Sequence, residues 1–119
     1  MGREKRKFGK LGEDYALEYL KGKGYKVLGR NIQVGKGEID IVAKKGKLIV
    51  FVEVKARRSD EYVDVLDSID REKEESLISS CEEYLTKNSL EGVDYRIDLV
   101  GIIIRDGRVE KFEHMEGII

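Results

Sequence analysis

The sequence predicts an α/β protein with the element order αβββαβ and one extra strand, in which a mixed central sheet has a helix on each face. Amphipathic helical patterns at residues 4–22 and 68–88 enclose three β-rich segments. Residues 95–104 form a continuous apolar run, which is typical of a strand buried on both faces. Because a helix joins the third strand to this buried strand, we expect the two to be parallel neighbours with a right-handed crossover.

The first helix is expected over residues 4–22, where charged residues gather on one side and apolar residues cover the rest. Gly22 and Gly24 supply its stop. Glu13 breaks this pattern because it lies inside the apolar arc, between Leu17 and Leu20.

Three strands are expected next, at residues 25–34, 38–44 and 47–55, the first of them irregular around Gly29. Lys45-Gly46 is a hairpin signal between the second and third strands. Residues 56–67 are polar and irregular.

The second helix, residues 68–88, has a buried stripe that includes Lys73, and Ser68 or Asp70 would cap it. After strand 95–104, a tight turn at Asp106-Gly107 leads into a last strand at 108–115.

The chain has 119 residues, which is the size of one domain spanning residues 1–119. Its single cysteine, Cys81, excludes an intramolecular disulfide and a cysteine zinc cage, and its place on the helical stripe predicts a core residue. No apolar run approaches the ~20 residues of a membrane helix. The basic start of the chain has no apolar stretch behind it. We therefore expect a cytoplasmic protein with no membrane partner.

The formal net charge of −1 hides a strong asymmetry. Residues 1–58 hold 16 Lys and Arg against 7 Asp and Glu, a net charge of +9. Residues 59–119 hold 7 against 17, a net charge of −10. We expect a positive rim around a small acidic pocket, with the excess negative charge held away from any nucleic acid.

Two carboxylates and an ammonium group mark the predicted hairpin, at Asp40, Glu53 and Lys55. With a two-residue loop at Lys45-Gly46, Asp40 lies opposite Phe51 and has Glu53 as a diagonal neighbour ~7 Å away on the same face. A loop of three or five residues would put Asp40 on the opposite face. The other face of these strands is wholly apolar and is expected in the core, at residues 39, 41, 43, 48, 50, 52 and 54.

Buried like charges repel, so the two carboxylates predict a partner, and a divalent cation is the simplest one. Mg²⁺ prefers few carboxylates, several waters and phosphate oxygens, and it stabilises the charge that develops when a phosphodiester is cut. Lys55 would orient or deprotonate a water, and Glu13 would close the site from the first helix. The alternatives are structural: a Glu53–Lys55 ion pair at an exposed strand end, and a half-buried Glu13 paired with a lysine.

The sequence resembles the YraN-type family of small predicted endonucleases over nearly the whole chain. Short motifs carry this similarity: Gly12-Glu13, Ala16, Tyr19-Leu20, Gly24-Tyr25, Leu28, Arg30-Asn31, Gly37–Ala43, Val50–Lys55, Arg57, Lys73, Leu77, Tyr84-Leu85 and Arg96–Asp98. That family is similar to the PD-(D/E)xK nuclease superfamily, near the archaeal Holliday-junction resolvases.

The resemblance implies a restriction-endonuclease-like αβββαβ core. It also implies metal ligands at Asp40 and Glu53, a catalytic Lys55, an accessory acid at Glu13, and Mg²⁺ or Mn²⁺ as the cofactor. In such sites the backbone carbonyl between the Glu and the Lys, here that of Val54, is often a further ligand.

Phosphate contacts are expected at four basic residues: Lys10, Arg30, Arg57 and Arg58. The alternatives are a solvated loop at Arg57 and Arg58, and an Arg30 that only satisfies the backbone at a strand kink.

Two other polar features are expected to be structural. Arg96 and Asp98 flank apolar residues and predict an ion pair within the buried strand. His114, on the terminal strand, is expected at the surface and outside the site.

The expected function is a metal-dependent endonuclease that acts on DNA phosphodiester bonds, at branched or otherwise structured sites. A homodimer would supply the two sites that two cuts on a two-fold junction need. The alternatives are a catalytically silent nucleic-acid-binding or protein-interaction module on the same fold, and an acidic half that docks a basic protein or a second subunit. No small-molecule cofactor is expected.

Overall fold

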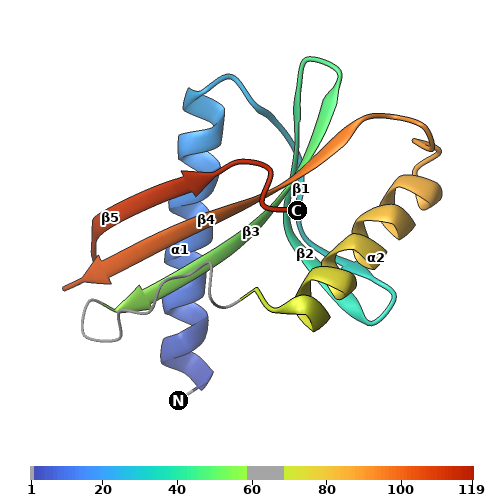
Figure 1. Ribbon diagram of the computed structural model, residues 1–119. Helices are drawn as coiled ribbons and strands as arrows, with labels where there is room; N and C mark the ends of the chain where they lie inside the picture. Colours follow the sequence, from blue (N-terminus) through green and yellow to red (C-terminus); the bar gives the residue numbers. More distant parts are fainter. Residues whose placement is uncertain (1, 59–68) are drawn as a thin grey trace.

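The protein is a five-stranded sheet covered by one helix on each face (Figure 1). This computed structural model describes the backbone of residues 2–58 and 69–119, and the side chains from residue 9 onward within those ranges. The expected irregular loop at 59–67 and the expected cap Ser68 lie outside the described residues. The elements are α1 Gly2–Gly22, β1 Lys26–Val34, β2 Gly37–Lys45, β3 Leu48–Arg58, α2 Arg71–Lys87, β4 Tyr95–Arg105 and β5 Arg108–Met115.

This element order confirms the predicted αβββαβ arrangement with one extra strand. The spatial order of the strands is β1-β2-β3-β4-β5, so each strand lies beside its neighbours in sequence. β3 and β4 are parallel and pair over ten positions, from Ile49↔Tyr95 to Arg58↔Ile104, and the other neighbours are antiparallel. α2 provides the connection that a parallel pair requires.

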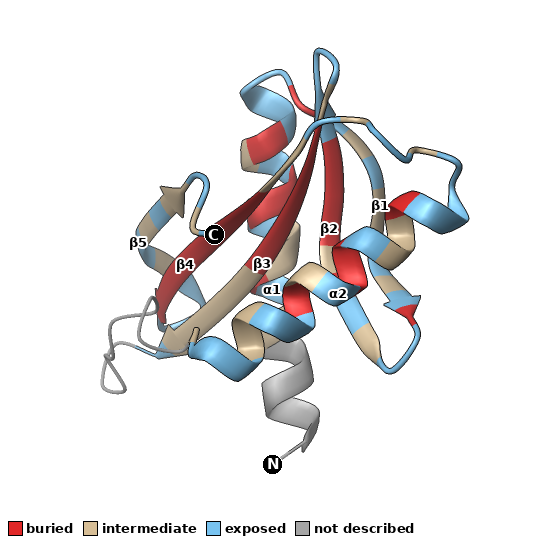
Figure 2. Ribbon diagram, turned by 45° about the vertical axis from the view of Figure 1, so that its right-hand side comes forward, coloured by how far each residue is buried: buried red, intermediate tan, exposed pale blue. Residues whose placement is uncertain are grey.

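The core has two layers because both faces of the sheet are covered. α1 packs Leu17 and Leu20 against one face, where they meet Val52 and Ile102. α2 packs Cys81 and Leu85 against the other face, where they meet Phe51. Figure 2 shows the consequence, since the buried residues run along β2, β3 and β4 at the centre of the sheet. Cys81 is therefore a core residue, as expected.

The turn between β2 and β3 differs by one residue from the expectation. Lys45 pairs with Leu48, so the two turn residues are Gly46 and Lys47 instead of Lys45 and Gly46. Val42 consequently lies opposite Phe51, where Asp40 was expected. Because this shift moves the register by two residues, the shift itself does not exchange the two faces of the hairpin.

Ile39 was expected beside Ile41, but it packs with Val42 and Phe51 in the layer under α2. The cause is the coiling of the β1–β2 ribbon. β1 contains a register shift between Val27 and Gly29, and Asn31 has a positive φ of 50°. Two-stranded ribbons twist strongly, and this one brings its turn against α2, where a Cβ on Gly37 would lie 2.5 Å from Ser80 Oγ.

The helix termini follow the sequence. Asp70 caps α2 by accepting a hydrogen bond from the Lys73 backbone N–H at 2.8 Å, as expected of one of the two candidate caps.

Among the described residues, neither helix is both long and apolar enough to pass through a lipid bilayer.

The packing of α1 on β3 depends on Gly12, where an added Cβ would lie 3.0 Å from the Cβ of Ala56. We expect Gly12→Val to destabilise the protein by about 1–3 kcal/mol, because a branched side chain would force α1 away from the sheet. Gly9 is the matched control: a Cβ there meets nothing within 4 Å. Gly9→Ala should stabilise the helix by about 0.5–1 kcal/mol. Urea denaturation measures both, and equal effects would show that α1 does not approach β3 this closely.

Candidate functional site

Asp40 and Glu53 come together where β2 and β3 separate. The ladder between β2 and β3 ends at the pair Ile41↔Val52, and the same register carried one step further puts Asp40 opposite Glu53. The backbone N–H of Val54 donates a hydrogen bond to Asp40 Oδ2 at 2.8 Å. The side chain of Glu53 is only 7% exposed. The sequence prediction that these two carboxylates meet is therefore correct.

The electrostatics of Asp40 show that this meeting is unfavourable for the protein alone. Burial, and then the negative charge of Glu53, raise the pKa of Asp40 from 3.8 to about 7. The Val54 N–H opposes this shift, Glu13 adds to it, and Lys55 opposes it weakly. At neutral pH the site therefore holds a carboxyl group that is poised between its neutral and charged forms. A cation placed here would favour the charged form.

Two lysines share one oxygen of Glu53. Lys55 Nζ and Lys73 Nζ each lie 3.4 Å from Glu53 Oε1. Lys55 comes from β3 and Lys73 from the first turn of α2, so the site is built from two elements that are distant in sequence. We predicted Lys55 at this position. Lys73 was predicted on the buried stripe of the helix and among the residues that carry the family resemblance, but no role in the site was predicted for it. A cation on an otherwise apolar stripe is the signal that could have indicated a buried anion.

Glu13 does lie near the site, but its partner was not predicted. Arg30 Nη2 lies 3.1 Å from Glu13 Oε1, and Arg30 Nη1 lies 2.8 Å from Asp14 Oδ1. Lys10 Nζ in turn lies 2.9 Å from Asp14 Oδ2. The hydrogen bonds from Lys10 and then Arg30 lower the pKa of Asp14, and the bond to Asp14 raises the pKa of Arg30. The charges of Arg30 and Lys10 are thus largely compensated within α1 and β1.

The other two basic residues proposed to contact phosphate lie at the end of β3. Arg57 donates a hydrogen bond to the carbonyl oxygen of Ala56 at 3.0 Å, and Arg58 is exposed. Both belong to regular strand, so the expectation of a loop here is wrong for these residues. Phosphate contacts of Lys10, Arg30, Arg57 and Arg58 stay predictions.

The expectation that the acidic half of the chain lies away from the pocket is wrong for α2. This helix begins beside Glu53, since Lys73 reaches that carboxylate from its first turn, and Glu72 and Glu74 flank Lys73. The crossover that joins the parallel strands β3 and β4 places the start of α2 there. This part of the surface consequently gives no electrostatic support for a nucleic-acid partner.

The donor set suits a cation that is only partly held by protein. Among residues 9–58 and 69–119, no three His, Cys, Asp or Glu side chains cluster closely enough to hold a metal ion. Asp40 and Glu53 alone supply two oxygen ligands. A set of two carboxylates with room for water and phosphate oxygens fits Mg²⁺ better than it fits Ca²⁺ or Zn²⁺.

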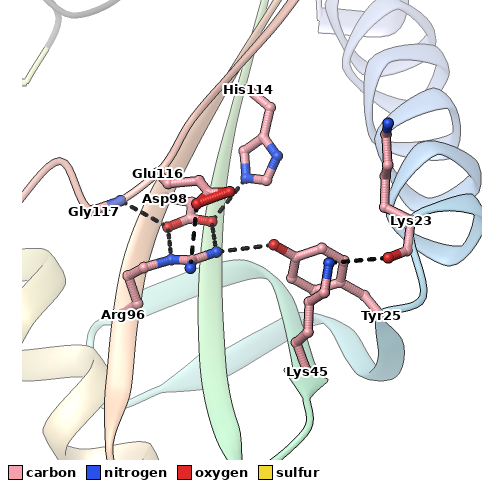
Figure 3. Close-up of polar contacts among 8 residues, drawn as sticks. All are labelled: Lys23, Tyr25, Lys45, Arg96, Asp98, His114, Glu116 and Gly117. Atoms are coloured by element: carbon pink, nitrogen blue, oxygen red, sulfur yellow. Dashed lines mark hydrogen bonds and ion pairs between the residues drawn. The ribbon is translucent and has the colours of Figure 1, made fainter.

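A second polar cluster lies on the opposite face of the sheet (Figure 3). Asp98 is fully buried and accepts hydrogen bonds from Arg96 Nε and Nη2, each at 2.8 Å, and from the Gly117 backbone N–H. His114 Nε2 lies 2.8 Å from Asp98, and its side chain is 7% exposed. The predicted Arg96–Asp98 ion pair is confirmed, whereas the expected surface position of His114 is wrong.

Asp98 contrasts with Asp40, because the Asp98 carboxylate accepts hydrogen bonds from several neighbouring groups that compensate for its charge. Burial alone would raise the pKa of Asp98, but the hydrogen bonds from His114, Arg96 and Gly117 outweigh burial and lower it. Arg96 also donates to the Tyr25 hydroxyl at 2.9 Å, which ties β4 to the segment that leaves α1. This cluster stabilises the fold and holds the chain after β5. We therefore place the candidate functional site at Asp40 and Glu53.

The five-stranded mixed sheet with a helix on each face is consistent with a restriction-endonuclease-like α/β core. The chain belongs to the uncharacterised protein family UPF0102, whose sequence profile matches residues 12–102. This membership confirms the resemblance to the YraN-type family.

Several relatives align with most of the chain. A UPF0102 protein of Chloroherpeton thalassium is 39% identical over 105 residues, which cover 88% of this chain and 81% of that protein. A UPF0102 protein of Dictyoglomus turgidum is 38% identical over 111 residues, covering 92% and 94%. Among solved structures, Pyrococcus furiosus SfsA in complex with Ca²⁺ matches with a TM-score of 0.32 and 16% identity, and the match covers 94% of this chain and 62% of that one.

Replacing Asp40 or Asp98 by asparagine is expected to change the stability of the folded protein in opposite directions. We expect Asp40→Asn to stabilise the metal-free protein at neutral pH by on the order of 2–4 kcal/mol. The unfolded chain loses the Asp40 proton near pH 3.8, but the folded protein keeps it until about 7. The advantage of the variant should therefore grow between these two pH values and level off above the second.

Asp98→Asn is the matched control and should destabilise by roughly 3 kcal/mol, because it leaves Arg96 without its buried partner. The pKa of Asp98 is lowered, so this carboxyl is ionised in both the folded and unfolded protein from about pH 5 upward. Its deficit should already be present at pH 5 and should persist at pH 8, because Arg96 lacks its buried counter-charge throughout this range. Urea denaturation across this range tests both variants. A destabilising Asp40→Asn at pH 8 would contradict the assignment of Asp40 as an unsatisfied charge.

Proposed function

We propose that this protein is a metal-dependent endonuclease that cuts DNA phosphodiester bonds, with a preference for branched or otherwise structured sites. The observation that carries the proposal is the close pair of partly buried Asp40 and buried Glu53, in which burial and the charge of Glu53 raise the pKa of Asp40 to about 7. Folded proteins retain such a pair when a ligand compensates for it. The resemblance to nucleases of the PD-(D/E)xK type supports DNA as the substrate.

The chain's own residues would divide the work as follows. Asp40 and Glu53 would hold Mg²⁺ or Mn²⁺, and the ion would supply positive charge to the scissile phosphate. The Val54 N–H fixes Asp40 through Oδ2, which leaves Oδ1 available to the ion. Lys55 keeps its ammonium group beside Glu53 Oε1, where it would orient the attacking water and offset charge on the phosphate. Glu13 would add an acidic group from α1.

Two cuts on a two-fold branched substrate need two such sites, which a homodimer would supply. A protein that contacts phosphates and sugars reads the shape of the backbone more than the base sequence, so preference for structured DNA suits a small site of this kind.

Cleavage of junction, flap and linear DNA with Mg²⁺ or Mn²⁺ tests the proposal. We expect Asp40→Asn and Lys55→Met each to lower the rate by about 100-fold or more, because each removes a group that acts on the reacting phosphate or water. Asp106→Asn is a suitable control. It removes an exposed carboxylate at the β4–β5 turn, where the φ of 51° is one that asparagine tolerates.

A thermal-shift measurement gives a readout that does not depend on choosing the right DNA. Mg²⁺ or Mn²⁺ should raise the Tm of the wild type and of Asp106→Asn, and should leave the Tm of Asp40→Asn unchanged. If metal stabilises the wild type but no DNA is cut, the silent binding module is the correct alternative. If metal does not stabilise the wild type, the site does not bind the ion and the proposal fails.

Lys73 provides a separate test of the metal site. Its ammonium group competes with any cation for Glu53 Oε1, because two lysines already lie 3.4 Å from that oxygen. We expect Lys73→Met to bind Mn²⁺ about threefold to tenfold more tightly than the wild type, since one competing charge is removed. Isothermal titration calorimetry measures this change. Lys87→Met, which removes an exposed lysine paired with Glu83 at the other end of α2, should leave the affinity unchanged. Unchanged or weaker Mn²⁺ binding by Lys73→Met would show that Lys73 does not compete for this carboxylate.

A further inference from the structure

The end of the molecule that carries the β2–β3 turn is rich in lysine. The turn lies beside the end of α1, since Lys45 Nζ donates a hydrogen bond to the Lys23 carbonyl oxygen at 3.1 Å (Figure 1). Residues 19–37 and 41–52 contain no Asp or Glu. We call this surface the lysine end, and it consists of Lys23, Lys26, Lys44, Lys45 and Lys47.

Two of these lysines face each other across the strands. Lys26 of β1 is the direct partner of Lys44 of β2, and both are exposed. Like charges directly opposite one another destabilise an antiparallel pair. Within residues 9–58 and 69–119, no carboxylate lies within ion-pair distance of Lys26, Lys44 or Lys47. The repulsion between Lys26 and Lys44 is therefore not offset by an ion pair with any carboxylate in the described part of the chain.

A third lysine is fixed in place. Besides its hydrogen bond to Lys23, Lys45 places its ammonium group 4.6 Å from the centre of the Tyr25 ring. A lysine that is held by a carbonyl and an aromatic face loses less side-chain entropy when it binds an anion. The charge of Lys45 is thus presented at a set position.

The lysine end borders a groove of about 670 Å³. Lys44, Lys45 and Lys47 line it together with the aliphatic side chains of Leu48, Leu90 and Val93. Asp94 is the one carboxylate in its lining. A groove that combines three ammonium groups with aliphatic walls matches a chain in which negative phosphates alternate with sugars.

We infer that the lysine end binds the phosphate backbone of nucleic acid and is the main electrostatic anchor of this protein on DNA. This inference deepens the proposed nuclease function and rests on it for the identity of the polyanion. It also moves the anchor away from Lys10 and Arg30, which already pair with Asp14 and Glu13.

The distance along the hairpin sets where the anchor lies relative to the candidate site. Asp40 and Lys45 are five residues apart on β2, which is about 17 Å at the usual rise of a strand. A B-DNA strand advances 3.4 Å per nucleotide along the helix axis while it winds around that axis, so this distance spans several phosphates. A backbone held by the lysines would therefore reach the carboxylates several nucleotides away.

The test compares two triple variants that lose the same charge. Lys26→Gln, Lys44→Gln and Lys47→Gln are combined in one protein. Arg105→Gln, Arg108→Gln and Lys111→Gln, all exposed and at the opposite end of the sheet from the β2–β3 turn, are combined in the control. Fluorescence anisotropy with a short labelled DNA duplex is measured as a function of salt, without divalent metal so that no cleavage occurs.

We expect the lysine variant to bind DNA about tenfold or more weakly at low salt, with the slope of log affinity against log salt reduced by about 2–3. The control should bind like the wild type. Equal losses in the two variants, or none in the lysine variant, would overturn the inference. So would polyglutamate that binds as tightly as the duplex through the same lysines, since the anchor would then not be specific for phosphate.

This outcome is separable from the outcome for catalysis. A protein that binds through the lysine end but cuts no DNA would refute the nuclease and support the anchor. A protein that cuts DNA, but whose lysine variant binds DNA normally, would support the nuclease and refute the anchor.

Discussion

The two-residue turn at Gly46-Lys47 fixes how β2 lies against β3, and both of the surfaces that we propose to be functional depend on it. Gly46 has a φ of 61°, which favours glycine and sets the turn at this point of the chain. Because side chains alternate along a strand, a register shift of one residue would place Asp40 on the opposite face from Glu53. The same turn projects three lysines at the other end of the hairpin. One local conformation thus determines a carboxylate pair and a basic surface together.

Fully buried Asp98 and partly buried Asp40 show how differently the fold can surround the same residue type. Asp98 has four hydrogen-bond donors around it and a lowered pKa, so its charge is fully compensated by the chain. Asp40 has one backbone donor, a neighbouring carboxylate and a raised pKa. Loss of solvent contact affects both, so it does not by itself mark a functional group. The deficit of donors at Asp40 is the difference on which our proposal of a bound cation rests.

Most of the fold is predictable from the sequence, because periodicity and turn residues are local signals. Each strand and helix lies within a few residues of its predicted range. The parallel pairing of β3 with β4 follows from the helix between them, and the pairing of Arg96 with Asp98 follows from their spacing. Ile39 could not be placed by alternation, since its face depends on the coiling of the whole β1–β2 ribbon. His114 could not be placed either, because its partner, Asp98, comes from another strand.

The chemistry of the site is only half predictable, because partners from distant elements decide how much charge each residue presents. Asp40, Glu53 and Lys55 lie on one hairpin, so their meeting follows from its register. Lys73 reaches Glu53 from α2, and Arg30 is compensated by α1, neither of which sequence spacing reveals. Counting basic residues near the carboxylates therefore overestimates the positive charge that is free to meet DNA. The positive charge that has no ion-pair partner lies at the turn end of the hairpin, where residues 41–52 contain no Asp or Glu. This is where we place a polyanion.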